Sequence, residues 1–315
     1  MIEKGNHSGV SEFILLGFAE PPEHRIILFV CLLTMYLITL AANCTIIFII
    51  LVDARLHTPM YFLLSILSLV DICLPTTTVP KLLANIFSKR KTISFNGCFI
   101  QLHFFISFGI MTDFLLAIMA VDRYLAISKP LHYAMLMSKG FCVKLVAGSW
   151  LIVSLLSAAN IILAARLSFC GSNEIHHYFC DLPPLFKLSC SDTSINEILL
   201  LTETSLLILG PLICIIISYI LIICTIWGMP SKKGKVKAFS TCSSHLSVVA
   251  LAYGPLLYIH IRPNSPYFVE KDLIISMLYS IGSSMLNPFV YSIRNKDVKM
   301  ALITALNKKV LSWNK

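Results

Sequence analysis

Seven separate stretches of the chain are long and apolar enough to cross a lipid bilayer, and short polar segments join them. Four of these stretches contain no charged residue, and the other three contain one each: Asp71, Asp113 and Glu203. A helix needs about 20 apolar residues to span the bilayer core, and it satisfies its backbone hydrogen-bonding groups within one segment. The pattern therefore predicts an all-α membrane protein, a seven-transmembrane helix bundle with spans at residues 26–52, 59–80, 92–121, 145–165, 198–231, 238–261 and 273–293.

Little of the chain lies outside the predicted bundle, which occupies residues 26–294. Residues 1–25 are polar and lack the apolar core of a cleavable signal peptide, so we expect an extracellular N-terminal tail and a first span that acts as the signal. Residues 295–315 form the predicted cytoplasmic tail. Apolar residues recur there at helical spacing opposite lysines, which predicts a short amphipathic C-terminal helix on the inner leaflet. The apolar positions are Val298, Ala301, Leu302, Ala305 and Leu306, and the polar ones are Lys296, Lys299, Lys308 and Lys309.

The distribution of charge predicts the orientation. Only 13% of the residues are charged, against about 25% in soluble domains, and the net charge is +9. With the N-terminus outside, the cytoplasmic side holds 15 of the 25 basic residues and three acidic ones. This is the positive-inside pattern, although Lys-Arg-Lys at residues 89–91 of the first outer loop runs against it. The basic balance thus indicates a lipid bilayer as partner and no nucleic acid.

Four cysteines lie on the predicted outer side. Cys98 begins the third span, and Cys170, Cys180 and Cys190 lie in the second outer loop at residues 166–197. Disulfides are expected in this oxidising compartment, and four cysteines allow three pairings. Asn6 begins an Asn-His-Ser sequon, which predicts glycosylation of the outer tail.

An acid–arginine pair, Asp122 and Arg123, closes the third span at the cytoplasmic border. Alone, the pair could be a snorkelling arginine with its counter-ion. The longer string MAVDRYLAISKPLHY at residues 119–133, however, resembles the odorant-receptor family of class A G-protein-coupled receptors. Other strings that resemble this family stand at matching places: LHTPMYFLL at 56–64, Ser-Tyr at 218–219, KAFSTCSSHL at 237–246 and LNPFVYSIRN at 286–295. The resemblance covers essentially the whole chain, with mild departures at Ala42, Val121, Ser128 and Ser284.

This resemblance implies a plasma-membrane receptor that binds small, mostly apolar volatile odorants and activates the stimulatory olfactory G protein, which raises cyclic AMP. It implies the disulfides Cys98–Cys180 and Cys170–Cys190. It assigns coupling and activation to Asp122, Arg123, Tyr124, Tyr219, His245 and Tyr291. It places the ligand between the third, fifth, sixth and seventh spans, at Leu102, Phe105, Ile106, Gly109, Ile110, Glu203, Thr204, Leu207, Tyr253, Leu256, Leu257, His260, Met277 and Ser280.

Several of these residues also have plainer interpretations. The apolar stripe of the third span follows the spacing of any packed helix face. If the stripe lines a ligand site instead, Gly109 would leave room for the ligand between the third and sixth spans. Glu203 could pair with bases of the loops, and His260 could face water at the outer leaflet. Asp71 could form a polar centre with Asn43, Asn287 and the Thr112-Asp113 step, because intramembrane charges usually serve a function. The resemblance suggests that a sodium ion binds there as the one possible cofactor. The alternative is a hydrated packing network without an ion.

Other classes of membrane protein fit the sequence less well. The seventh span has no lysine to hold retinal, and Phe105 stands where an amine receptor of this class needs an acid. No protease motif is present in the sequence, so we do not expect an enzyme. A small-molecule transporter is the alternative function. Pro211, Pro255 and Pro288 interrupt spans as in transporters, but the internal repeat that typically accompanies such breaks is absent from the sequence.

Overall fold

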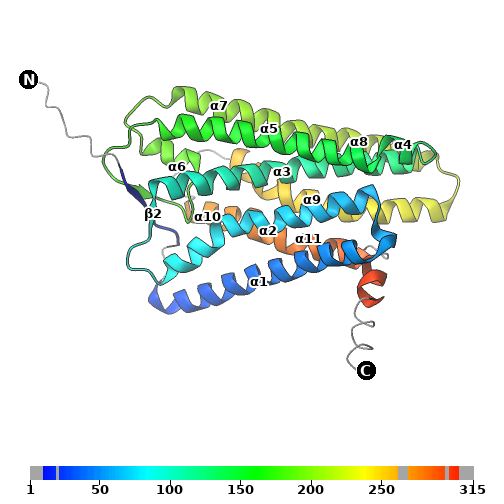
Figure 1. Cartoon of the computed structure of the whole chain (residues 1–315), viewed down its shortest axis with the longest axis horizontal. Coiled ribbons are helices and arrows are strands. Elements are labelled where there is room, and N and C mark those ends of the chain that lie inside the picture. Colours follow the sequence, from blue (N-terminus) through cyan, green and yellow to red (C-terminus); the bar gives the residue numbers. More distant parts are fainter. Residues whose placement is uncertain (1–9, 19–20, 262–268, 295–297, 305–315) are drawn as a thin grey trace, which may run out of the picture.

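The protein folds as a bundle of long helices that run side by side (Figure 1). The structure is a computed structural model that describes residues 10–18, 21–261, 269–294 and 298–304. In this part of the chain, seven helical segments are long and apolar enough to span a membrane: Glu23–Val52, Pro59–Ile86, Phe95–Ser128, Lys139–Ala165, Ser194–Gly228, Gly234–Ile259 and Lys271–Ser292. The predicted seven-transmembrane architecture is therefore confirmed.

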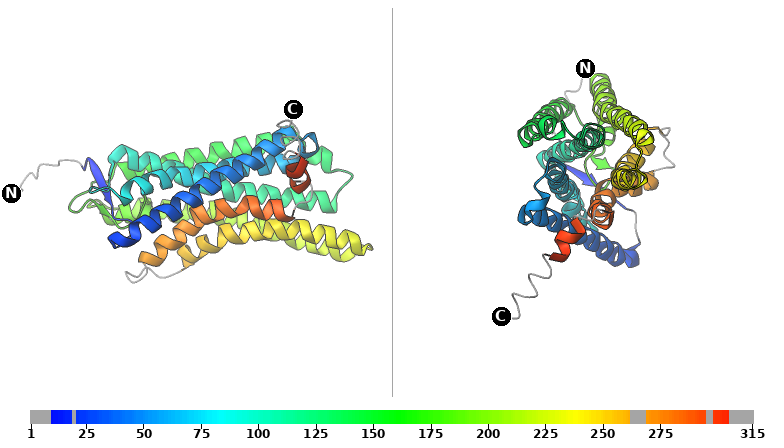
Figure 2. Two further views of the ribbon diagram at one scale, coloured as in Figure 1. Left: turned by 90° about the horizontal axis from the view of Figure 1, so that it is seen from below. Right: turned by 90° about the vertical axis from the view of Figure 1, so that its right-hand side faces the viewer.

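The first four spans are α1 (Pro22–Val52), α2 (Pro59–Ile86), α3 (Phe95–Ser128) and α5 (Lys139–Ala165). Their starts have local causes. Prolines begin α1 and α2, where the missing N–H would have had no helical partner. Ser94 and Ser138 cap α3 and α5, since their hydroxyls accept the N–H groups of Gly97 (3.1 Å) and Phe141 (3.3 Å). The end-on view in Figure 2 shows α3 in the interior of the bundle, where it can carry residues toward several neighbours.

The fifth and seventh spans each contain a π-helical turn. The fifth consists of α7 (Ser194–Thr204), a π-turn at Ser205–Leu209 and α8 (Gly210–Gly228). The seventh consists of α10 (Val269–Met277), a π-turn at Leu278–Gly282 and α11 (Ser283–Arg294), whereas the sixth is the single helix α9 (Lys232–Ile261). Single π-turns are frequent at functional sites. Two predicted ligand contacts, Leu207 and Ser280, fall within these turns.

A small sheet covers one end of the bundle, which is the end that the charge distribution assigns to the outer side and is called the outer end below. Its strands are β1 (Glu12–Leu15), β2 (Thr92–Ser94) and β3 (Glu174–Ile175), and β1 lies between an antiparallel β2 and a parallel β3. Phe13 and Leu15 of β1 are fully buried against the outer end of α3 and the second outer loop. Part of the expected N-terminal tail is thus folded, because its alternating apolar residues complete a core that the loops alone would leave open.

The inner end is closed by two short elements, a 3-10 turn at Ala54–Leu56 and α4 (Tyr133–Leu136), whereas the short helix α6 (Leu182–Lys187) lies in the second outer loop. Residues 298–304 are helical, and Val298 and Ala301 pack into the inner core while Lys299 is exposed. This agrees with the amphipathic pattern. Other positions of that pattern, and the sequon, lie outside the described residues: Lys296, Ala305, Leu306, Lys308, Lys309 and Asn6.

Large apolar side chains remain exposed along the outside of the helices, for example Leu51, Leu155 and Trp227. A surface of this kind would drive association in water and is satisfied by lipid tails. The interior, in contrast, holds buried polar groups such as Asp71 and Asp113. The candidate functional residues therefore have to be sought inside the bundle and at its two ends.

Candidate functional site

The predicted stripe of α3 points into the outer half of the bundle. All of its members are buried or half-buried: Leu102, Phe105, Ile106, Gly109 and Ile110. The Phe105 ring lies 4.4 Å from the Phe179 ring of the outer loop and 6.5 Å from the Tyr279 ring of the seventh span, measured between centroids. Phe105 thus joins an aromatic cluster formed by three distant segments of the chain.

The second outer loop supplies residues that the sequence analysis missed. The Tyr178 hydroxyl lies 3.3 Å from the Ser280 hydroxyl, and both side chains are fully buried. The N–H of Cys180 donates to the Gln101 side chain of α3 (3.0 Å), and that side chain in turn donates to Thr77 of α2 (2.9 Å). The loop therefore acts as an ordered lid over the Phe105 cluster. The signal that could have revealed it is the position of Tyr178 and Phe179 directly before Cys180.

Two disulfides hold this lid, and they are the two pairings that the resemblance implied. Cys98 at the start of α3 is bonded to Cys180, and Cys170 is bonded to Cys190 within the loop. The Cα–Cα distances of 5.5 and 5.9 Å suit a disulfide. The first bond fixes the height of Phe179 above Phe105.

His177 belongs to the same lid. Its ring packs edge-on against Phe179 and stacks on Tyr178. Burial lowers the pKa of His177 to about 3, because the charged imidazolium would lose its hydration there. His177 is therefore neutral from mildly acidic to neutral pH, and we expect its packing in the lid to be independent of pH in that range.

Gly109 does not leave free space between the third and sixth spans, as the ligand interpretation expected. A Cβ atom added to Gly109 would lie 2.8 Å from the Tyr279 hydroxyl oxygen, which is closer than real Cβ contacts allow. The hydroxyl of the seventh span thus occupies the space that the glycine provides. Gly109 allows α3 and the seventh span to approach each other, and a ligand would reach this level by moving Tyr279.

Below this contact, Asp113 links α3 to α9. The Tyr253 hydroxyl donates to the Ile208 carbonyl oxygen of the fifth span (3.5 Å) and lies beside the Asp113 side chain, and Tyr279 lies within electrostatic range of the same side chain. Asp113 is fully buried, and one of its oxygens has no hydrogen-bond partner. A hydrogen bond inside a protein is worth about 0.5–1.5 kcal/mol, so this contact favours the arrangement in which α9 lies against α3.

Glu203 lies in the interface between α7 and α5. Its buried carboxylate accepts a hydrogen bond from the Asn160 amide of α5. Glu203 is therefore hydrogen-bonded to an amide of the neighbouring span and not to a basic residue of the loops. Its other oxygen is buried without a partner.

The remaining predicted ligand contacts are distributed over several clusters. Leu256 belongs to the same buried cluster as Tyr253, Leu257 packs against that cluster, and Met277 packs against the cluster that contains Phe179. Leu207 is buried and Thr204 is half-buried, but neither belongs to the clusters around Phe105. The His260 side chain lies outside the described part of the structure.

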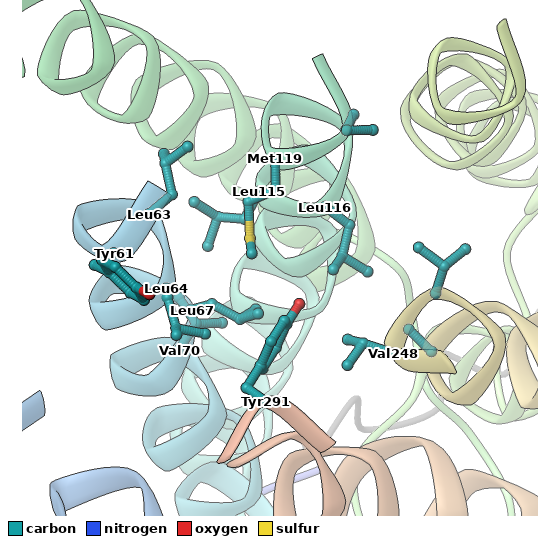
Figure 3. Close-up of a cluster of buried hydrophobic side chains, with 14 of the residues drawn as sticks. Tyr61, Leu63, Leu64, Leu67, Val70, Leu115, Leu116, Met119, Val248 and Tyr291 are labelled. Atoms are coloured by element: carbon teal, nitrogen blue, oxygen red, sulfur yellow. The ribbon is translucent and has the colours of Figure 1, made fainter. Parts of the chain in front are cut away.

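At the inner end, Arg123 stands among residues of three other helices. It is only 5% exposed and lies within electrostatic range of Tyr219 of α8, His245 of α9 and Tyr291 of α11. Figure 3 shows Tyr291 reaching toward the side chains of α3. The structure thus brings together residues that the sequence separates by more than 150 positions.

The neighbours of Arg123 are themselves connected. The Asp122 carboxylate accepts the Tyr133 hydroxyl of α4 (2.7 Å), while Tyr124 packs on the inner core. The Tyr219 hydroxyl lies 2.9 Å from His245 Nδ1, and His245 Nε2 lies 3.1 Å from the Leu116 carbonyl oxygen of α3. Because Nε2 can only donate to a carbonyl, His245 is a second tie between α9 and α3.

The predicted polar centre forms without Asp113. The Asn287 amide donates to the buried Asp71 carboxylate (2.9 Å), and the Asn43 amide donates to the Ser284 carbonyl (3.0 Å). Thr112 bonds within its own helix, to Phe108. The amide oxygens of Asn43 and Asn287 are buried without a partner, and oxygen atoms of this kind suit a hard cation or water.

Comparisons with known proteins extend over nearly the whole chain. Residues 31–309 match the family described as "Olfactory receptor". The chain is 49% identical to mouse olfactory receptor 1M1 over 309 residues, which cover 98% of this chain and 99% of the relative. It is 48% identical to human olfactory receptor 1F1 and 49% identical to human olfactory receptor 1C1, each over 307 residues and 98% of both chains.

Proposed function

The chain belongs to the olfactory receptor family of G-protein-coupled receptors, and we propose that it detects small, mostly apolar volatile molecules from the extracellular side of the plasma membrane. The proposed site lies beneath the outer-loop lid, among Phe105, Tyr253, Leu256 and Met277. The observation that carries this proposal is the aromatic cluster of Phe105, Phe179 and Tyr279, which lies directly above the Asp113–Tyr253 contact. A ligand that separates these rings acts on the contact between α3 and α9.

We propose that the receptor activates a stimulatory G protein, which raises cyclic AMP. In the resting arrangement, Tyr253 and His245 tie α9 to α3 at two heights. Movement of the inner end of α9 away from α3 would break the lower tie and uncover Arg123, Tyr219 and Tyr291. A ligand drives this change only as far as it binds the open arrangement better than the closed one.

The chemistry of the proposed site suggests weak and broad recognition. The aromatic and aliphatic lining favours apolar molecules, and the hydroxyls of Tyr253, Tyr279 and Ser280 can each make a hydrogen bond. A ligand of about ten heavy atoms that gains about 0.5 kcal/mol per atom binds with about 5 kcal/mol. This free energy corresponds to a dissociation constant on the order of 0.1 mM.

A cyclic AMP screen of the expressed receptor against a few hundred odorants tests this function. We expect several structurally related agonists with half-maximal concentrations on the order of 0.1 mM. Uptake of labelled odorant without any second-messenger response would instead favour the transporter interpretation.

Gly109→Ala is expected to lower agonist potency about tenfold, because the new methyl group would displace the Tyr279 hydroxyl from its place against α3. The double variant Gly109→Ala with Tyr279→Phe should recover most of this loss, since it removes the clashing oxygen. Gly148→Ala is the matched control, because a Cβ there meets no atom within 4 Å. The half-maximal concentration in the cyclic AMP assay measures the effect, and an additive double variant would contradict the explanation.

Tyr253→Phe is expected to raise the ligand-independent cyclic AMP level. The substitution removes the hydroxyl that contacts Asp113, and a loss of about 1.4 kcal/mol shifts an equilibrium about tenfold. Asp113→Asn weakens the same contact, so combining the two changes should add little to either. The exposed Tyr258→Phe serves as control. Unchanged basal activity in both single variants, at equal surface expression, would show that this contact does not hold α9.

We also propose a sodium ion at the polar centre, where Asp71, Asn43 and Asn287 would hold it; a bound cation there would favour the closed packing of α2 against α11. The unpartnered amide oxygens of Asn43 and Asn287 support this proposal. Sodium, compared with a bulky organic cation at equal ionic strength, should raise the melting temperature of the purified receptor. Asp71→Asn should remove this dependence, and a dependence that survives in Asp71→Asn would place the ion elsewhere.

A further inference from the structure

A small cavity of about 20 Å³ opens at the outer end of the bundle, on the side of α1 and α2. Its wall comes from four segments: the turn after β1, the first turns of α1, the end of α2 and the residue before β2. Tyr178 of the lid completes it. A volume of this size holds one water-sized group. The cavity is separate from the Phe105 cluster, since Phe105 does not line it.

Two cations share this cavity. Arg25 of α1 and Lys91 of the first outer loop both line it, and among the described residues no aspartate or glutamate does so. The Lys91 ammonium also donates to the Leu16 carbonyl oxygen (3.0 Å). Burial and the charge of Arg25 lower the pKa of Lys91, so the two positive charges are close enough to repel each other.

The position of Arg25 at the start of α1 adds to the electrostatic repulsion between the two cations. It lies in the first turn of α1, whose N-terminal end carries a partial positive charge and therefore attracts anions. Glu23 is in the same turn but does not line the cavity. One anion in the cavity would neutralise the repulsion between Arg25 and Lys91.

The rest of the wall suits one small charged group. Asn85, which is only 6% exposed, adds an amide, and Leu28, Leu82 and Ile86 add apolar surface. Arg25 is exposed and Lys91 is half-buried, and the apolar wall beside Lys91 strengthens the attraction of its charge for an anion. Among the described residues, the wall adds no charged side chain besides Arg25 and Lys91, so it suits one small, singly charged group.

We propose that this cavity binds a small monovalent anion, of the size of chloride or a carboxylate group, and that Arg25 and Lys91 both contact it. The anion would join β1 and the turn after it to α1 and α2, and so stabilise the outer end against which the lid packs. The same charged group could come from a free ion or from the headgroup of an acidic lipid at the outer surface.

Thermal stability of the purified receptor in nanodiscs of neutral lipid tests the proposal without any odorant. Chloride or acetate is titrated at constant ionic strength against a sulfonate buffer anion too bulky for the cavity. We expect a saturable rise in melting temperature of about 3 °C. Arg25→Gln and Lys91→Gln should each remove the rise, whereas Lys91→Arg and the neighbouring exposed Arg90→Gln should keep it.

The lipid source is distinguished by a second set of nanodiscs that contain an acidic phospholipid. A stabilisation by that lipid which depends on Arg25 and Lys91, with no effect of chloride or acetate, would identify a headgroup as the occupant. Line broadening of the chloride NMR signal gives a readout that does not depend on stability, in case a variant folds poorly. Stabilisation and broadening that persist in the Arg25→Gln, Lys91→Gln double variant, or an absence of both anion and lipid effects in the natural protein, would overturn the proposal.

Discussion

Arg123→Ala is expected to abolish odorant-driven cyclic AMP while leaving odorant binding largely intact. Arg123 is buried at the inner end, within electrostatic range of Tyr219, His245 and Tyr291, and far along α3 from Phe105. When α9 moves away, the guanidinium is the group that becomes available to a G protein. Its removal should therefore reduce the maximal response to background and change the ligand affinity little.

Arg55→Ala is the matched control for this experiment. Arg55 also lies at the inner face, but it is exposed and pairs with the neighbouring Asp53 at 2.6 Å. Exposed ion pairs of this kind contribute about 0–1 kcal/mol, so this variant should signal normally. A well-expressed Arg123→Ala receptor with a normal cyclic AMP response would refute the role of Arg123.

Cys98→Ala is expected to remove nearly all receptor from the cell surface. The Cys98–Cys180 bond closes a sequence separation of 82 residues and holds Phe179 over Phe105. A disulfide is worth roughly 2–4 kcal/mol, and more for a longer loop. Without it, the lid and the small sheet that packs beside it would lose their anchor on α3, and quality control should retain the protein.

Cys170→Ala should be milder, because that bond closes only 20 residues, and the difference in loop entropy amounts to about 1 kcal/mol. Cys224→Ala, which changes an exposed free cysteine of α8, should have no effect. Surface labelling of an epitope-tagged receptor measures all three variants. Peptide mapping that finds Cys180 as a free thiol in the folded protein would contradict the pairing.

The seven spans could be predicted from the sequence because each one is a long apolar stretch with at most one charged residue, and a helix satisfies its backbone hydrogen bonds within one such segment. The site residues on α3 could be placed for a related reason, since helical spacing fixes which side chains share a face. The resemblance of several sequence strings to the odorant-receptor family led to the cluster around Arg123, whose members come from four helices.

Other features depend on tertiary contacts that no local pattern encodes. The strand at Glu12–Leu15 pairs with two strands from separate outer loops, and the local sequence does not encode that pairing. The role of Gly109 depends on where Tyr279 points, and the π-turn at Leu278–Gly282 shifts the direction of that residue. The sequence analysis grouped Asp113 with Asp71, yet the Asp113 side chain contacts Tyr253 of α9.

The most direct test of the central claim compares two neighbouring phenylalanines of α3. Phe105 points to the lid at Phe179, whereas Phe104 is 43% exposed and stacks on Phe108 of the same helix. The measurement is the cyclic AMP dose–response curve of an agonist from the odorant screen, at matched surface expression. We predict that Phe105→Ala raises the half-maximal concentration about tenfold or more, equivalent to about 1.4 kcal/mol of lost contact, and that Phe104→Ala changes it less than about twofold. Two curves that coincide with that of the natural receptor would place the odorant outside the Phe105 cluster and contradict the account.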